Sequence, residues 1–148
     1  MSDEEPRVIV GGSSTDDRGT LFFVNDFDPS TCRRSYVVTN HSAGFVRAWH
    51  GHRREGKFVT VLRGAAIVAA VRVLDWDQPD PNAKVDRWIL SERTPSVLFI
   101  PPGYANGAMS LTSDTMIQYF STSTLADSKG DDIRFDARFW NPWSVEER

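Results

Sequence analysis

The sequence contains one cysteine, Cys32, so no internal disulfide can form and the fold does not depend on an oxidising compartment. No apolar run approaches the roughly 20 residues that a membrane span requires. The acidic, polar start at Met1–Pro6 is unlike a signal peptide. A net charge of −3 gives no concentrated basic field for nucleic acid or anionic membranes. We therefore expect a soluble cytoplasmic protein with neither partner, in which local arginines and lysines bind any anionic ligand.

Helical periodicity is also missing, because no helical apolar pattern continues for three turns and only Asp127–Asp132 could form a short turn. The apolar residues instead form short runs rich in Val, Ile, Phe, Tyr and Thr, separated by turn signals. With 40% hydrophobic and 25% charged residues, the chain has the balance of a globular protein. We predict one all-β domain over residues 1–148, a sandwich or open barrel. The predicted strands are Val8–Val10, Leu21–Val24, Tyr36–Thr39, Gly44–Trp49, Phe58–Leu62, Ala65–Leu74, Arg87–Leu90, Ser96–Ile100, Gly107–Leu111 and Thr115–Thr122.

The most informative segment runs from Gly44 to Gly64. His50 and His52 lie two positions apart on a predicted strand, so both side chains point to one face, which in a small barrel is the interior or its mouth. Lys57 follows closely, and a lysine that faces inward needs a partner or a function. This segment therefore predicts a site in which two imidazoles lie beside one ammonium.

The spacing of these residues resembles the first motif of the cupins, and Pro101–Asn106 resembles the second. The resemblance implies a cupin fold, that is, a double-stranded β-helix or jelly-roll barrel. A metal-binding cupin carries a glutamate ligand at the position of Lys57 and a histidine ligand at that of Asn106. An ammonium has no free lone pair, and an amide is a poor zinc or iron ligand. By strand parity, Glu55 should point away from His50 and His52. We therefore expect no metal and no cofactor, and predict an acid–base site.

Beyond the general cupin pattern, the chain resembles the dTDP-4-dehydrorhamnose 3,5-epimerase superfamily of metal-free cupins. The likeness begins at Asp17-Arg18-Gly19 and covers most of the chain. Its matching segments are Asp17–Phe23, Asn40-His41-Ser42, Arg47–His50, Lys57, Gly103–Gly107 and Tyr119. The resemblance implies a nucleotide-activated 4-keto-sugar as the substrate and, as in related cupins, a homodimer.

The resemblance also implies roles for individual residues. His50 is the base that takes a proton from the carbon next to the 4-keto group, Lys57 stabilises the enolate oxygen, and Tyr119 returns a proton from the other face. Arg18 and Arg47 resemble arginines that hold the pyrophosphate. The chemistry agrees, because such a base needs a pKa near neutrality and the developing enolate needs a fixed positive charge.

Four other expectations about the site depend on strand parity and aromatic character. Asn106 should contact substrate, and Trp49 and Tyr104 could stack on a base or sugar. Arg47 lies three positions before His50, so a bulge or the barrel mouth must bring it to the same side. Trp140 and Trp143 should cover the barrel end or a subunit interface.

Departures from the epimerase pattern leave the reaction open. The family's histidine-orienting aspartate has no recognisable counterpart up to Arg148, and its acidic pair is replaced by Val68 and Arg72. His52 is unusual in the epimerases and looks more like the dTDP-sugar 3,4-ketoisomerases. Lys57 and Tyr119 favour C3 or C5 epimerisation in deoxysugar and polysaccharide biosynthesis. The alternatives are a 3,4-ketoisomerase, a catalytically silent sugar- or nucleotide-binding cupin, and a metal-dependent dioxygenase-type cupin, which Lys57 and Asn106 disfavour.

Overall fold

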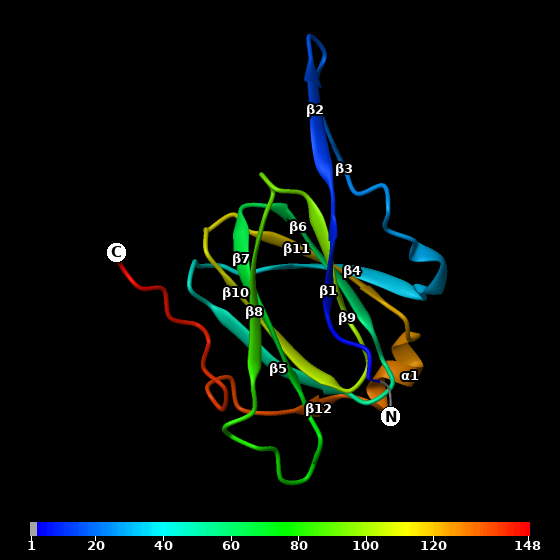
Figure 1. Ribbon diagram of the computed structural model, residues 1–148, viewed down its shortest axis with the longest axis vertical. Helices are drawn as coiled ribbons and strands as arrows, with labels where there is room; N and C mark the ends of the chain where they lie inside the picture. Colours follow the sequence, from blue (N-terminus) through cyan, green and yellow to red (C-terminus); the bar gives the residue numbers. More distant parts are fainter. Residues whose placement is uncertain (1–2) are drawn as a thin grey trace.

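The computed structural model describes residues 3–148 and is nearly all β, as predicted. Two five-stranded antiparallel sheets pack as a cupin-like sandwich (Figure 1). The first sheet has the order β1 (Arg7–Val10), β9 (Ser96–Ile100), β6 (Lys57–Arg63), β11 (Met116–Ser121) and β4 (Arg34–Thr39). The second has the order β12 (Ile133–Arg134), β5 (Val46–His52), β10 (Tyr104–Ser110), β7 (Ala65–Arg72) and β8 (Val85–Ser91).

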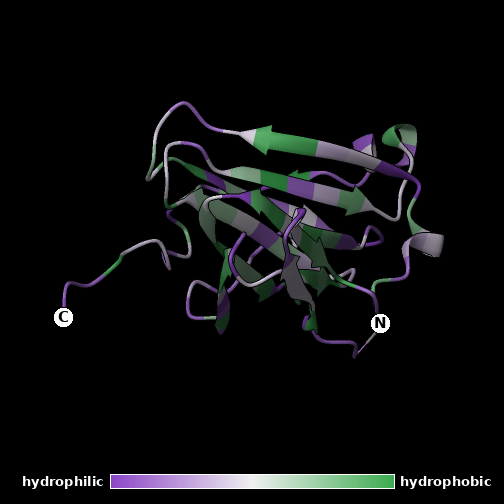
Figure 2. Ribbon diagram, turned by 90° about the horizontal axis from the view of Figure 1, so that it is seen from above, coloured by the Kyte–Doolittle hydropathy of each residue, from purple (hydrophilic) through white to green (hydrophobic). Residues whose placement is uncertain are grey.

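The core lies between the sheets, where the inward-facing residues of both pack together, among them Val59, Val68, Leu98 and Ile117. Exposure alternates along β4, between half-buried and exposed residues, and along β11, between half-buried and buried residues, so each strand has one face towards the core. The strands β7 and β10 are buried on both faces, because a second apolar cluster containing Trp140 and Trp143 covers the outer side of their sheet. Figure 2 shows the hydrophobic residues concentrated in the strands and the hydrophilic ones in many of the loops.

A hairpin of β2 (Gly12–Asp16) and β3 (Gly19–Phe23) projects beyond the sandwich (Figure 1). It pairs with neither sheet, and Leu21 and Phe22 on it are 65% and 58% exposed. The remaining elements are the 3-10 turn η1 (Pro29–Thr31) and the short helix α1 (Leu125–Lys129), which overlaps the turn predicted at residues 127–132. No helix within residues 3–148 is long and apolar enough to cross a membrane.

All ten predicted strands overlap observed strands, but the boundaries differ where glycine or polar residues obscure the pattern. Gly44 adopts φ +79° and precedes β5, which begins at Val46 and continues through His52. The polar strand β2 and the two-residue strand β12 were not predicted, since neither carries an apolar run.

Candidate active site

A pocket of about 220 Å³ opens between the two sheets. Six of the nine predicted site residues line it: His50, His52, Lys57, Tyr119, Arg47 and Asn106. The other lining residues are Tyr36, Val38, Ser128, Asp132 and Arg134. Cationic, imidazole and phenol groups therefore meet in one polar cavity.

Register in the sheets explains why these side chains meet. His50 pairs with Asn106 on one side of β5 and with Arg134 on the other. In the facing sheet, Tyr119 pairs with Tyr36 across the β11–β4 ladder. The two sheets thus carry the two imidazoles and the two phenols to opposite walls.

Arg47 lines the pocket because the pairing register between β10 and β5 is interrupted. Asn106 pairs with His50, whereas Ala108 pairs with Arg47, so three steps on β5 match two on β10. A bulge of this kind reverses the parity of the residues beyond it. Within the pocket wall, the Arg47 Nε donates a hydrogen bond to Asn40 Oδ1 at 2.6 Å.

Lys57 supplies the pocket with a nearly buried cation, 7% exposed. Its Nζ donates a hydrogen bond to the Tyr36 hydroxyl at 3.0 Å and lies 5.7 Å from the ring centroids of both Tyr36 and Tyr119. The two rings stack at 5.2 Å with 15° between their planes. Burial, with a smaller contribution from Tyr36, raises the pKa of Tyr119, so its hydroxyl keeps its hydrogen at neutral pH.

His50 is held as a neutral imidazole. Burial and, to a smaller extent, the charges of Arg134 and Lys57 lower its pKa to about 4, and Asp132 opposes them. The Asp132 carboxylate is itself occupied by Arg134, whose Nε lies 2.8 Å from Oδ1. Within residues 3–148, no side chain makes a hydrogen bond to the His50 ring.

Glu55 was expected to point away from the histidines, and this is wrong. The parity argument assumed that the strand continues to residue 55, but β5 ends at His52 and the chain turns. The Asp131 carboxylate accepts the backbone N–H groups of Arg53, Arg54 and Glu55 at 2.8, 2.9 and 3.0 Å. This anchored turn brings the Glu55 carboxylate to 3.0 Å from His52 Nδ1.

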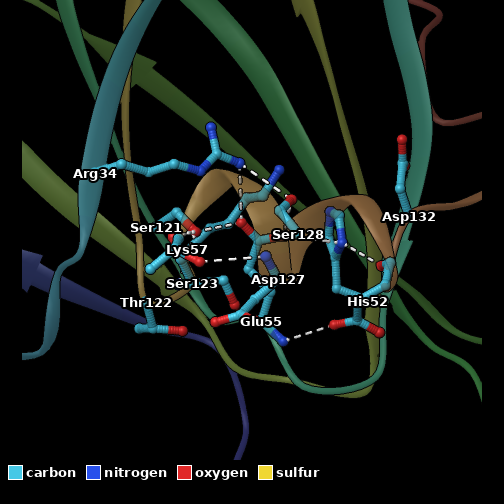
Figure 3. Close-up of polar contacts among 12 residues, drawn as sticks. Arg34, His52, Glu55, Lys57, Ser121, Thr122, Ser123, Asp127, Ser128 and Asp132 are labelled. Carbon is cyan, nitrogen blue, oxygen red and sulfur yellow. Dashed lines mark hydrogen bonds and ion pairs between the residues drawn. The ribbon is translucent and has the colours of Figure 1, made fainter.

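Glu55 forms the centre of a buried polar network, with Arg34, Ser121 and Ser128 grouped around it (Figure 3). Arg34 donates to Oε1 at 3.2 Å, Ser128 donates to Oε2 at 3.0 Å, and Ser121 donates to Oε1. Burial raises the pKa of Glu55, but hydrogen bonds from His52 and Ser121 and the charges of His52 and Lys57 outweigh it, so the pKa falls to about 2. The carboxylate is therefore ionised and saturated with donors.

Trp49 and Tyr104, predicted to stack on substrate, do not line the pocket. Trp49 is fully buried in the cluster on the outer side of β5, where its Nε1 donates to the Trp140 carbonyl at 3.0 Å. Successive side chains of a strand point to opposite faces of the sheet, so Trp49 lies on the other side of the sheet from its neighbour His50. Tyr104 is buried in the core between the sheets, with the Arg72 guanidinium 4.9 Å from its ring centroid.

Arg18 also lies elsewhere, on the turn of the projecting hairpin. Its side chain is 86% exposed and pairs with Asp16. Trp140 and Trp143 cover the outer side of the β5–β10–β7 sheet and contact Trp49.

Sequence reasoning missed five lining residues, among them Tyr36, Asp132 and Arg134. Tyr36 could have been found, because it begins a predicted strand whose alternate residue, Val38, also lines the pocket. Asp132 and Arg134 reach the pocket from the short segment at β12, which carries no strand signal.

The pocket does not fit a metal ion. No group of three or more His, Cys, Asp or Glu side chains that could hold one occurs within residues 3–148. The ammonium of Lys57 faces the same cavity as His50 and His52 and repels a cation. The Asn106 Nδ2, moreover, donates to the His50 carbonyl at 3.2 Å.

The family model described as dTDP-4-dehydrorhamnose 3,5-epimerase matches residues 7–146. Among solved structures, the enzyme dTDP-6-deoxy-D-glucose-3,5-epimerase RmlC from Legionella pneumophila, in complex with dTDP-4-keto-L-rhamnose, is similar with a TM-score of 0.75 at 20% identity. That alignment covers 100% of this chain and 83% of that chain. The rmlC epimerase of Mycobacterium tuberculosis gives a TM-score of 0.67 at 18% identity, covering 84% of this chain and 66% of that one.

A mutant of the 3,4-ketoisomerase QdtA from Thermoanaerobacterium thermosaccharolyticum, in complex with TDP-4-keto-6-deoxyglucose, is similar with a TM-score of 0.69 at 15% identity. That alignment covers 91% of each chain. At these identities the structural likeness establishes the fold. No curated protein shows significant sequence similarity to the chain.

Proposed function

The chain belongs to the dTDP-4-dehydrorhamnose 3,5-epimerase family, and from this premise we propose that it epimerises carbon 3, carbon 5 or both of a 4-keto-6-deoxy nucleotide hexose in deoxysugar and polysaccharide biosynthesis. One observation carries the proposal: the buried Lys57 ammonium shares a pocket with two imidazoles and a protonated phenol. Such a set can remove a proton beside a ketone, stabilise the enolate and supply a proton.

In the proposed reaction, His50 accepts the proton from the carbon next to the keto group. Its neutral state at physiological pH leaves a nitrogen lone pair available. The Lys57 ammonium stabilises the developing enolate oxygen, and its near-complete burial strengthens the interaction. Tyr119, on the opposite wall, returns a proton to the other face, while Arg47 and Asn106 contact the substrate.

A second candidate is the 3,4-ketoisomerase reaction, which removes a proton at C3 and returns one at C4 through an enediol. His52 favours it, because its side chain joins that of His50 in lining the pocket. Two imidazoles on one wall suit a proton shuttle along one face of the sugar, whereas epimerisation needs a donor on the opposite face. Tyr119 supplies such a donor and favours the epimerase.

We also propose that the enzyme is cytoplasmic, metal-independent and a homodimer. The projecting hairpin supports the dimer, because it exposes Leu21 and Phe22, and Phe22 lines a groove of about 560 Å³ together with Phe23, Val24 and Phe27. Within residues 3–148, the Arg18 side chain on that hairpin pairs with Asp16 alone. A dimer that pairs the hairpin with a second copy is the arrangement in which Arg18 can approach a pocket and hold a pyrophosphate.

Incubation with dTDP-4-keto-6-deoxyglucose in D₂O tests the reaction by NMR. Deuterium entering C3 or C5 with the ketone retained at C4 supports the epimerase, and movement of the ketone to C3 supports the isomerase. If no deuterium enters C3 or C5 of several nucleotide sugars, both reactions are contradicted. The alternative that then stands is a sugar- or nucleotide-binding protein without catalytic activity. Stoichiometric iron, manganese or zinc in the purified protein contradicts the metal-independent site.

A further inference from the structure

The His52 ring faces two different surroundings through its two nitrogens. Nδ1 lies 2.7 Å from the Asp131 carbonyl oxygen and 3.0 Å from Glu55 Oε2. A carbonyl and an ionised carboxylate both accept and cannot donate, so Nδ1 must carry a hydrogen. In the neutral ring, the lone pair is therefore fixed on Nε2.

Nε2 is fully buried and has no hydrogen-bond partner among residues 3–148, although His52 lines the pocket. An unpaired buried polar atom is rare in a folded protein and calls for an explanation. Because His52 is one of the residues that line the pocket, a ligand bound there can supply the missing partner. The unpaired lone pair is what a proton acceptor awaiting its substrate requires.

Glu55 has the features of a carboxylate that orients such a ring. It is 2% exposed, and Arg34, Ser121 and Ser128 hold its two oxygens in place. Its negative charge faces Nδ1 and stabilises the imidazolium that forms when Nε2 accepts a proton. The His50 ring, in contrast, donates no hydrogen bond to a carboxylate within residues 3–148, and the nearby Asp132 is occupied by Arg134.

We infer that His52 is a second proton-transfer group of this pocket and that Glu55 is its positioning residue, an inference that rests on the proposed reaction at a keto-sugar. In the step assigned to His52, a C–H bond beside the ketone breaks, its electron pair enters the enolate, and its proton forms an N–H bond at Nε2. Nδ1 keeps its own hydrogen and Glu55 remains ionised. Transfer of the Nε2 proton back to carbon regenerates the neutral ring.

The kinetic test compares Glu55→Gln, Glu55→Asp and His52→Asn in turnover of dTDP-4-keto-6-deoxyglucose. A glutamine can present its amide N–H to Nδ1 and favour the wrong tautomer, so we expect kcat to fall about 10²-fold while KM changes little. Glu55→Asp keeps the charge and should recover part of kcat, and His52→Asn should lose about 10²–10⁴-fold. Asp114→Asn, which alters a carboxylate in the surface turn before β11, is the matched control. Wild-type kcat in Glu55→Gln would overturn the inference.

The second test needs neither turnover nor a variant of Glu55. The chain has three histidines, so ¹⁵N NMR can assign the His52 ring by comparison with the spectrum of His52→Asn. We expect Nδ1 to be protonated and Nε2 to be bare in the neutral ring, and an Nε2–H tautomer would overturn the inference even if Glu55→Gln fails to fold. If the wild-type protein transforms no keto-sugar, the proposed function fails, whereas the tautomer still decides whether Nε2 of His52 carries the free lone pair on which the inference depends.

Discussion

The Lys57 ammonium lies 3.0 Å from the Tyr36 hydroxyl, and this hydrogen bond fixes the cation against the wall that carries Tyr119. A lysine that is 7% exposed loses most of its hydration, so a neutral replacement of similar shape relieves that penalty. Its retention in the pocket is therefore explained better by function than by stability.

Replacing Lys57 by methionine should separate these two effects. We expect kcat to fall about 10²–10³-fold, because the enolate oxygen loses its fixed positive charge. Unfolding free energy should stay the same or rise, which a urea titration followed by circular dichroism measures. A variant that keeps more than a tenth of wild-type kcat would show that Lys57 does not stabilise the enolate.

Tyr119→Phe and Tyr36→Phe form a matched pair, because the rings stack on each other and each variant loses only one hydroxyl. With Tyr119 as the donor on the second face, Tyr119→Phe should still allow deuterium to enter the substrate from D₂O but should release little inverted product. Tyr36→Phe should retain inversion, since Lys57 keeps its charge. The reverse pattern, measured by NMR of the sugar, would make Tyr36 the acid.

His50→Asn should abolish deuterium exchange at the carbon that His50 serves, because an amide cannot accept the proton. Burial and the charges of Arg134 and Lys57 keep His50 neutral, so the replacement removes no buried charge and the melting temperature should change little. Exchange at a near-normal rate in a folded variant would refute His50 as the base.

Strand alternation and motif spacing were sufficient to predict the all-β fold and to place His50, His52 and Lys57 together. Both signals are local in sequence, and the register of β5 preserves them. The position of Glu55 was not predicted, because it depends on a turn held by Asp131, a residue 76 positions away in the chain. No pattern within the turn indicates that contact.

The position of Trp49 also depends on residues that are distant in the sequence. An aromatic residue next to His50 is compatible with stacking on substrate, but Trp140 and Trp143, the partners of Trp49, come from the other end of the chain. The apolar character of that distant segment was recognised, while the face of the sheet it covers could not be deduced. Arg18 is similar, because nothing in the sequence shows that its hairpin leaves the sandwich.

Trp49→Phe tests the structural role of Trp49. Its ring is fully buried and its Nε1 donates to the Trp140 carbonyl, so the variant leaves a cavity and an unpaired carbonyl. We expect the unfolding free energy to fall by about 1–3 kcal/mol and the KM for substrate to stay within about twofold of wild type. A large rise in KM with unchanged stability would restore Trp49 as a substrate contact.

Stability should decrease in acid through His50 and Glu55, over two different pH ranges. His50 has its pKa lowered from 6.5 to about 4, so from pH 6.5 downwards the unfolded chain binds a proton that the folded one does not. Its contribution is fully present above pH 6.5 and is lost as the pH falls towards 4, and it amounts to about 2 kcal/mol for this partly buried ring.

Glu55 has its pKa lowered from 4.5 to about 2, so its contribution is present above pH 4.5 and is lost as the pH falls towards 2. Urea titrations at pH 7, 5.5 and 4.5 should therefore show a decline in unfolding free energy before Glu55 begins to titrate. His50→Asn should flatten that decline, since an amide does not titrate, while His41→Asn, which alters an exposed histidine, should leave it unchanged. An equal decline in wild type and His50→Asn would show that the His50 pKa is not lowered in the folded protein.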